Sequence, residues 1–228
     1  MTFSEFLIDL IDGRESVHIA LSGGSTPKVV FDVLAEHFGS KIVWSKLHLY
    51  WGDERCVPPD DAESNYKMTV DHLLSKVAIP KKNIHRIKGE NDPQKEAKRY
   101  ARILGKNLPV SAGLPQFDLV ILGMGDDGHT ASIFPNALAL WDKKSYCVVA
   151  EHPDSGQKRI TITGQLINNA KAVAFLVTGA NKSGKVREII LKEGNFKKYP
   201  ATRVDPISGN LYWFLDPAAA DGVKGVRS

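Results

Sequence analysis

The sequence is poor in cysteine and has no recognisable pattern of metal ligands. Its 228 residues contain two cysteines, Cys56 and Cys147. Two cysteines exclude a disulfide-rich scaffold and a four-cysteine zinc site, and they suit a reducing compartment. The histidines show no spacing such as H-x-x-x-H, which is typical of metal ligands. We therefore expect no metal site in this protein.

Long apolar runs are missing as well. No stretch approaches the roughly 20 apolar residues that a membrane helix needs, and runs such as 172–177 are short. The N-terminus lacks a basic region and has acidic residues inside its apolar pattern, which excludes a signal peptide. We expect a cytoplasmic protein that has no membrane partner.

The charge is close to balanced. The 30 Lys and Arg residues against 26 Asp and Glu residues give a net charge of +4 at pH 7. This small excess permits an anionic small substrate, but nucleic-acid binding usually shows a dense basic patch, so we expect no nucleic-acid partner. The content of 43% hydrophobic and 25% charged residues is ordinary for globular proteins and excludes a disordered or fibrous chain.

Short β-rich runs alternate with amphipathic helical patterns along the chain. Runs such as 119–122 and 173–177 are apolar at every position, as in a parallel sheet that helices cover on both sides. The alternation predicts an α/β fold with an open, doubly wound, mostly parallel sheet and helices on both faces. The expected strands are 17–21, 47–51, 117–122, 146–150, 159–163, 172–178 and 211–215, and the expected helices are 3–11, 27–38, 64–76, 93–106 and 183–192, the last stopped by Gly194.

Ligands of such sheets bind beyond the carboxyl ends of the strands, so motifs that follow strands are candidates for a site. The first motif is Ser22-Gly23-Gly24-Ser25-Thr26, between a strand and a helix. Its glycines let the backbone approach a ligand, and a helix N-terminus offers free N–H groups to an anion. No lysine follows at the spacing of a Walker loop. The motif is either a phosphate loop or a turn in which Thr26 caps the helix.

The second motif is Asp53-Glu54-Arg55, after the strand at 47–51. Two carboxylates beside a guanidinium need partners when they are buried. As a substrate clamp, Arg55 pairs with an anionic oxygen while Asp53 accepts a hydroxyl group or orients a histidine. As a solvated loop, the three residues make a local ion pair. The residues alone leave both interpretations open.

The third motif, GMGDDGH at 123–129, formally matches G-x-G-x-x-G. We reject a dinucleotide site because Asp126 and Asp127 lie where a pyrophosphate would approach, and like charges repel. A neutral His129 can take a proton from water near pH 7, and carboxylates close by can orient it. The alternative is a surface or core histidine, which a glycine-rich loop at a strand end disfavours.

The fourth motif surrounds Lys182, at the start of the helix after the strand at 172–178. The helix dipole disfavours a cation there, and a phosphate between Lys182 and the helix N–H groups would remove the mismatch. Arg159, where the strand at 159–163 begins, is a further cation of the same possible site. For each cation the alternative is a solvated surface charge.

Together the motifs resemble the lactonase branch of the glucosamine-6-phosphate isomerase/deaminase superfamily, whose fold is of the NagB/RpiA type. The His129 stretch followed by SIFP at 132–135 is specific to the lactonases, because the deaminases have Asn-Glu-Pro in place of 133–135 and a Tyr in place of Arg55. The matching stretches extend over nearly the whole chain: 21–27, 52–58, 63–66, 117–135, 159–161, 178–182 and 213–216.

The resemblance implies hydrolysis of 6-phospho-D-glucono-1,5-lactone in the pentose phosphate pathway, without a metal ion or organic cofactor. His129 would be the general base that activates water, with Asp53 as the second catalytic residue. Backbone N–H groups of 125–128 are candidates for binding the oxyanion. The implied substrate- and phosphate-binding residues are Ser22, Gly23, Gly24, Ser25, Thr26, Arg55, Arg159 and Lys182.

Because these motifs alternate from Ser22 to Lys182, we expect one domain over 1–228, as a monomer or homodimer. The family pattern usually begins with an extra strand, so we expect that N-terminal strand to be missing. Two other functions stay open, namely isomerase or deaminase chemistry of the same superfamily and a non-catalytic sugar-phosphate sensor. The sensor predicts an attached helix-turn-helix, for which the residues before Val17 leave no room.

Overall fold

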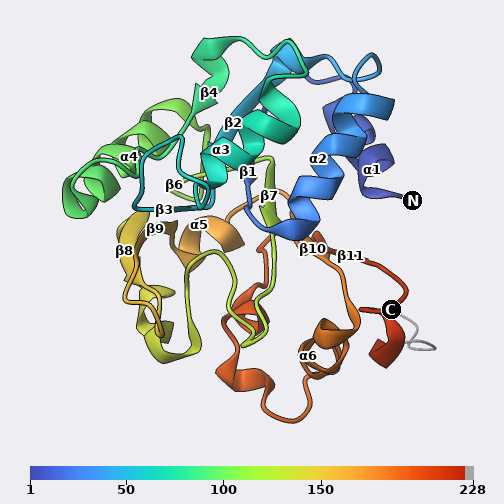
Figure 1. Cartoon of the computed structure of the whole chain (residues 1–228), viewed down its shortest axis with the longest axis vertical. Helices are drawn as coiled ribbons and strands as arrows, with labels where there is room; N and C mark the ends of the chain where they lie inside the picture. Colours follow the sequence, from blue (N-terminus) through green and yellow to red (C-terminus); the bar gives the residue numbers. More distant parts are fainter. Residues whose placement is uncertain (224–228) are drawn as a thin grey trace.

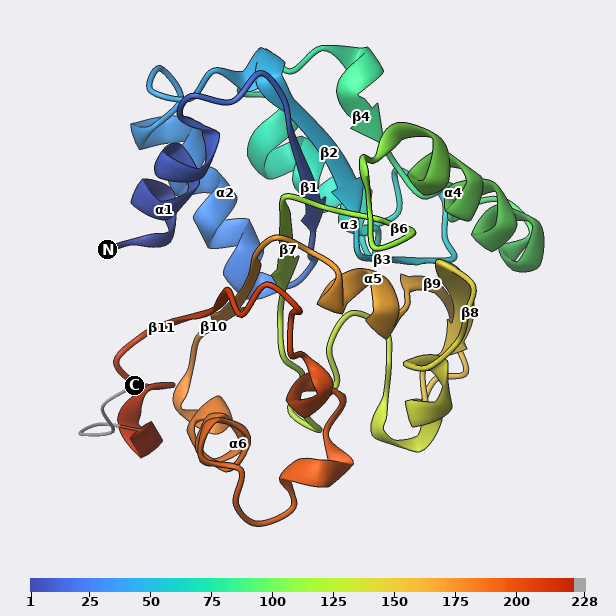
Figure 2. The same cartoon turned by 180° about the vertical axis from the view of Figure 1, so that it is seen from behind.

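The computed structural model describes residues 1–223. At its centre is a six-stranded sheet in the order β11-β10-β7-β1-β2-β4, in which every neighbouring pair is parallel. Figure 1 shows α2 and α3 in front of this sheet, and Figure 2, seen from behind, shows β1 and β2 in front of these helices. The predicted α/β fold is confirmed. The strands are β1 (Val17–Leu21), β2 (Leu47–Trp51), β4 (Ile84–His85), β7 (Leu119–Leu122), β10 (Val173–Val177) and β11 (Leu211–Leu215).

The strand order explains where a ligand can bind. From β1 the chain adds β2 and β4 on one side, and β7, β10 and β11 on the other. The loops that leave β1 and β7 therefore separate, and a crevice opens at the carboxyl ends of these strands. The inner strands β7 and β10 are buried at every residue, which gives the crevice a rigid floor.

The helices follow the expected patterns, with shifted ends. The predicted helix at 27–38 begins two residues earlier, because Gly24 and not Thr26 is its N-cap. The predicted helix at 183–192 begins at Ala180, and it ends at Lys192 in a left-handed conformation (φ 55°) rather than at Gly194. The helices are α1 (Phe3–Ile11), α2 (Ser25–His37), α3 (Asn65–Thr69) with a π-helical continuation Val70–Leu74, α4 (Pro93–Asn107), α5 (Gly164–Asn168) and α6 (Ala180–Leu191).

A second, antiparallel sheet consists of β3 (Asp53–Arg55), β9 (Lys158–Ile162) and β8 (Cys147–Glu151). No strand was predicted at 53–55, since three charged residues have no apolar alternation that would indicate one. The strand β3 forms because it pairs with β9, which lies more than 100 residues later in the sequence. This pairing brings Arg55 opposite Arg159. A small hairpin joins β5 (Val110–Ser111) to β6 (Leu114–Pro115).

Within residues 1–223, no helix has the length and apolar character needed to cross a membrane. Over the same range, no three His, Cys, Asp or Glu side chains are grouped in a way that could hold a metal ion. Cys56 and Cys147 are both free thiols. The single domain and the cytoplasmic location stay predictions.

Candidate active site

A pocket of about 230 Å³ lies at the carboxyl ends of β1, β2, β7 and β10. Because the strands are parallel, the loops that follow them lie at one edge of the sheet, where they form the wall of the pocket. The roles of the predicted residues stay predictions, but the structure brings all of them around this pocket: Ser22, Gly23, Gly24, Ser25, Thr26, Asp53, Arg55, His129, Arg159 and Lys182.

The loop after β1 turns directly into α2. Gly24, with φ 107°, is the N-cap of α2, and no side chain caps this end of the helix. The first N–H groups of a 13-residue helix therefore stay open to an anion. Gly23 packs so closely on Asn65 that a Cβ atom would lie 1.8 Å from Oδ1 of Asn65. A larger residue at this position would displace the Asn65 side chain.

Asp53 is 5% exposed and lines the pocket from β3. Its carboxylate accepts hydrogen bonds from Oγ of Ser132 at 2.5 Å and from Nδ2 of Asn65 at 3.4 Å. Ser132 lies on a loop and Asn65 is the first residue of α3, so Asp53 joins two separate parts of the pocket wall. Its carboxylate does not contact His129, so Asp53 does not orient that ring.

Glu54 is a buried carboxylate that holds β3 to the start of α3. It accepts hydrogen bonds from the backbone N–H groups of Arg55 at 2.8 Å, Asn65 at 2.7 Å and Tyr66 at 2.8 Å, and from the Ser64 hydroxyl at 3.1 Å. Burial raises the pKa of Glu54 to about 6, although the backbone N–H groups act in the opposite direction. The cluster fixes Asn65 beside the pocket.

Two guanidinium groups lie opposite each other across β3 and β9. Burial, followed by the positive charge of Arg55, lowers the pKa of Arg159 below its usual value. Nη1 of Arg55 donates to the carbonyl of Glu63 at 2.6 Å, while its buried Nε has no hydrogen-bond partner among the described residues. Adjacent like charges and an unpaired buried donor are both stabilised by an anionic ligand such as a phosphate.

His129 is held by a carboxylate two residues away. Its Nδ1 lies 2.6 Å from Oδ1 of Asp127, and its backbone N–H donates to the same oxygen at 3.0 Å. Burial raises the pKa of Asp127, but these hydrogen bonds outweigh burial and the pKa lies below its usual value. An Nδ1–H directed at Asp127 leaves Nε2 unprotonated, as a base requires.

The turn that carries His129 is closed by its own backbone. The N–H of Gly125 donates to the carbonyl of His129 at 2.9 Å, and the N–H of Gly128 donates to the carbonyl of Gly125 at 3.0 Å. The expectation that N–H groups of 125–128 bind an oxyanion is therefore wrong for these two, because both are already hydrogen-bonded inside the turn.

Lys182 lies in the first turn of α6, and its side chain points at the turn that carries His129. Its Nζ is 2.6 Å from Oδ1 of Asp126, which also accepts Nδ2 of Asn181 at 2.7 Å. The carboxylate of Asp126 thus supplies a negative charge at the start of α6, where a bound phosphate had been predicted to do so. The Lys182 ammonium has three N–H donors, so the ion pair leaves donors that can bind a ligand in the pocket that Lys182 lines.

Two contributors to the site, Asn65 and Ser132, were not predicted as site residues, and Asp127 was predicted only as one of the carboxylates close to His129. The spacing of Asp127 and His129 on one glycine-rich loop was a local signal for their contact. Asn65 and Ser132 carried no such signal, because each reaches Asp53 only through tertiary packing.

Comparison with known proteins gives consistent matches. A family model described as glucosamine-6-phosphate isomerases/6-phosphogluconolactonase matches residues 2–213. A 6-phosphogluconolactonase of Haemophilus influenzae is 46% identical over 204 residues, covering 89% of this chain and 86% of that protein. A 6-phosphogluconolactonase of Treponema pallidum is 45% identical over 188 residues, covering 81% and 78%.

A solved structure of the 6-phosphogluconolactonase from Trypanosoma brucei matches with a TM-score of 0.83 and 31% identity, covering 96% of this chain and 92% of that one. The family match over residues 2–213 includes every loop that lines the pocket. The chain therefore belongs to the family of glucosamine-6-phosphate isomerases and 6-phosphogluconolactonases.

Proposed function

We propose that this protein hydrolyses 6-phospho-D-glucono-1,5-lactone to 6-phospho-D-gluconate, a step of the oxidative pentose phosphate pathway, and needs no cofactor. The observation that carries the proposal is the contact between Asp127 and His129 at the edge of a pocket lined by three cations. A base beside a cationic pocket fits an ester whose remote end is a phosphate. The relatives named as lactonases support the same substrate.

The phosphate of the substrate binds between Arg55, Arg159 and Lys182, and the open N-terminus of α2 faces it. Two guanidinium groups and an ammonium are charge-assisted donors, which bind phosphate oxygens more strongly than neutral donors do. Binding this remote group orients the lactone carbonyl relative to His129. Asp53 accepts a hydroxyl group of the sugar, since its carboxylate lines the pocket and does not contact the histidine.

His129 acts as the general base. Its Nε2 takes a proton from water while the water oxygen forms a bond to C1 of the lactone, and the negative charge of Asp127 stabilises the imidazolium. The tetrahedral intermediate then breaks the bond between C1 and the ring oxygen. The imidazolium returns its proton to that oxygen as it leaves, and the product carboxylic acid releases one proton to solvent.

The released proton makes a direct test possible. With fresh lactone and a pH indicator, the protein should accelerate acid release far above the spontaneous rate. His129→Ala should lower kcat by about 10² to 10⁴-fold, the usual contribution of a positioned base. A variant that retains full activity and the unfolding temperature of the wild type would show that His129 is not the base.

The family also contains isomerases, so the same preparation should be tested with glucosamine 6-phosphate. We expect no ammonia release, because the 132–135 segment has the sequence of the lactonases. Ammonia release without lactone hydrolysis would replace the proposal with deaminase chemistry, and tight sugar-phosphate binding without either activity would indicate a sensor. The cytoplasmic location and the monomeric or homodimeric state stay predictions.

A further inference from the structure

The segment Trp51–Val57 carries Asp53 and Arg55, two residues of the pocket wall. Arg55 makes no ion pair with any described residue, and its only side-chain hydrogen bond goes to the carbonyl of Glu63. The place of its guanidinium therefore depends on its backbone. Tyr100 of helix α4 contacts this segment at its first residue, and Gly89 of the loop before α4 packs on it at its other end.

The first contact is made by Tyr100, which is fully buried on α4. Its hydroxyl accepts the N–H of Trp51 at 2.8 Å and donates to the carbonyl of Trp51 at 3.0 Å. The neighbouring strand β4 pairs with β2 only as far as Tyr50. The Tyr100 hydroxyl thus takes the place of a neighbouring strand at Trp51, the last residue of β2 and the first of the Trp51–Val57 segment.

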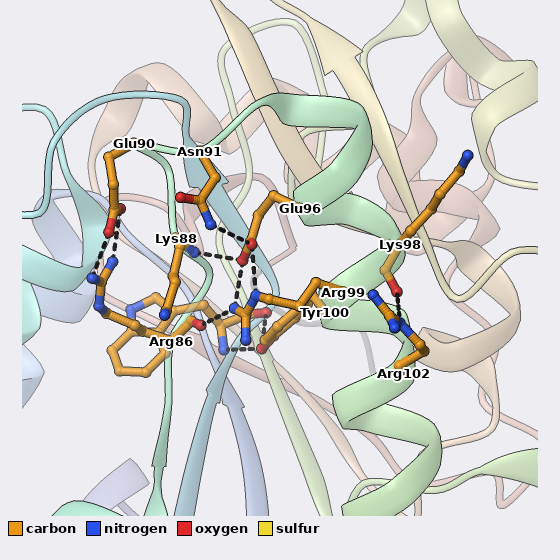
Figure 3. Close-up of polar contacts among 10 residues, drawn as sticks. Arg86, Lys88, Glu90, Asn91, Glu96, Lys98, Arg99, Tyr100 and Arg102 are labelled. Carbon is orange, nitrogen blue, oxygen red and sulfur yellow. Dashed lines mark hydrogen bonds and ion pairs between the residues drawn. The ribbon is translucent and has the colours of Figure 1, made fainter.

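The second contact depends on Glu96, whose carboxylate has no exposed surface. It accepts the N–H of Lys88 at 2.7 Å, Nδ2 of Asn91 at 3.1 Å, and Nε and Nη2 of Arg99 at 2.6 and 2.5 Å. Nη2 of Arg99 also donates to the carbonyl of Arg86 at 3.1 Å. Figure 3 shows these bonds converging on Glu96, so that the 86–91 loop is fixed to α4.

The fixed loop in turn supports the backbone of Arg55. Gly89 packs so closely on it that a Cβ atom would lie 2.3 Å from the carbonyl oxygen of Arg55 and 2.6 Å from that of Val57. A shift of the loop is therefore transmitted directly to the residue that bears the guanidinium. Through these contacts α4 holds the Trp51–Val57 segment at its beginning and at its end.

We propose that Glu96 and Tyr100 are positioning residues that set the place of Arg55 in the pocket. The inference rests on the proposed function only in taking Arg55 as a phosphate ligand. The two residues lie outside the pocket and touch no substrate. They act by fixing the backbone on both sides of Arg55, against the repulsion from Arg159 across the sheet.

The main test is Glu96→Gln, with Glu90→Gln as the matched control, because Glu90 lies on the same loop but pairs with Arg86 at the surface. We expect Glu96→Gln to raise the Kd for inorganic phosphate, measured by calorimetry, and the KM for the lactone about 10- to 100-fold, with a much smaller change in kcat. The control should change neither constant more than about twofold. A lower unfolding temperature with unchanged Kd and KM would overturn the inference.

Two further variants test the route through Arg55. Gly89→Ala inserts a methyl group against the Arg55 carbonyl without changing charge, and should raise the same two constants. Gly105→Ala on α4, whose Cβ meets only ordinary contacts, is its control. In the Arg55→Met background, Glu96→Gln should cause no further loss of phosphate binding, because coupled residues are non-additive. Additive losses would contradict a route through Arg55.

The outcomes separate this inference from the proposed function. A wild-type protein that binds phosphate but hydrolyses no lactone refutes the lactonase proposal, while weaker phosphate binding by Glu96→Gln still supports the positioning role. A wild-type protein that hydrolyses the lactone, with Glu96→Gln and Gly89→Ala both unchanged in KM and Kd, refutes the positioning role alone.

Discussion

At the scale of single residues, the site depends on which group each carboxylate contacts. Asp127 contacts His129 and Asp126 contacts Lys182, while Asp53 contacts neither and is bound by Ser132. The adjacent residues Asp126 and Asp127 thus have different partners. Of the three, Asp127 is the one in place to stabilise the charge that the imidazole gains.

Asp127→Asn keeps the shape of this side chain and removes its charge. We expect kcat for lactone hydrolysis to fall about 10²-fold or more, because the imidazolium loses its carboxylate and the ring loses the tautomer that leaves Nε2 unprotonated. Stopped-flow measurement of acid release checks this. Asp142→Asn, which removes an exposed carboxylate paired with Arg203, is the control, and an equal loss in both variants would argue against the pair.

Arg159→Met should separate phosphate recognition from chemistry. We expect the KM for the 6-phospholactone to rise about tenfold or more, since a charge-assisted contact is lost, while hydrolysis of unphosphorylated glucono-1,5-lactone stays at the wild-type rate. Lys158→Met removes the neighbouring cation, which pairs with Glu151 at the surface, and should change neither substrate. Parallel losses on both substrates would contradict a phosphate-binding role.

At the scale of elements, three histidines stack across one end of the sheet. His18 of β1 stacks on His48 of β2 at 4.7 Å, and His85 of β4 stacks on Tyr50 of β2 at 4.4 Å. Burial, and then the neighbouring histidines, lowers the pKa of His85 to about 4. Burial also lowers the pKa values of His18 and His48. Asn107 of α4 contacts His85 from the other side.

The stack predicts acid sensitivity of the fold. A histidine whose folded-state pKa lies below the unfolded value of about 6.5 binds fewer protons when folded, so stability is lost as pH falls from about 6.5 towards 4. Because His85 is only half-buried, solvent screening reduces the effect of this shift, and we expect His85→Gln to lessen the loss of stability between pH 7.5 and 4.5 by about 1 kcal/mol. Urea unfolding of both proteins at pH 7.5 and 4.5 measures this difference in the free energy of unfolding. The exposed His37→Gln should retain the wild-type slope, and an unchanged slope in His85→Gln would refute the assignment.

The elements also show what could be predicted locally. Strands such as β7 and β10 and helix α4 were predicted within two residues, because their periodicity and the Asp92 cap are local features. The strands β3 and β4, the short β5–β6 hairpin and the helix α5 were missed. The strands β3 and β4 pair with β9 and β2, and α5 begins against Trp141, so these short segments depend on distant partners. Residues near the pocket were found through the rule that ligands bind at strand ends.

At the scale of the whole molecule, ligand binding should stabilise the fold. The pocket draws its walls from loops spread between Ser22 and Lys182, so an anion that joins them binds the folded chain and not the unfolded one. At 100 times its Kd, 6-phosphogluconate should add about 2.7 kcal/mol to the free energy of unfolding. Thermal unfolding with and without ligand checks this, and Arg159→Met should need a higher ligand concentration for the same rise.

Apolar periodicity and glycine-rich turns are local properties of the chain, and they sufficed to predict the α/β class, the order of the main strands and helices, and the loops that face the ligand. Tertiary contacts were needed to show which carboxylate orients His129, that Arg55 lies opposite Arg159, and that Glu96 and Tyr100 support the Arg55 backbone. Those contacts join segments that the sequence keeps apart, or choose among neighbouring acids of equal chemistry, and the packing of the folded chain makes that choice.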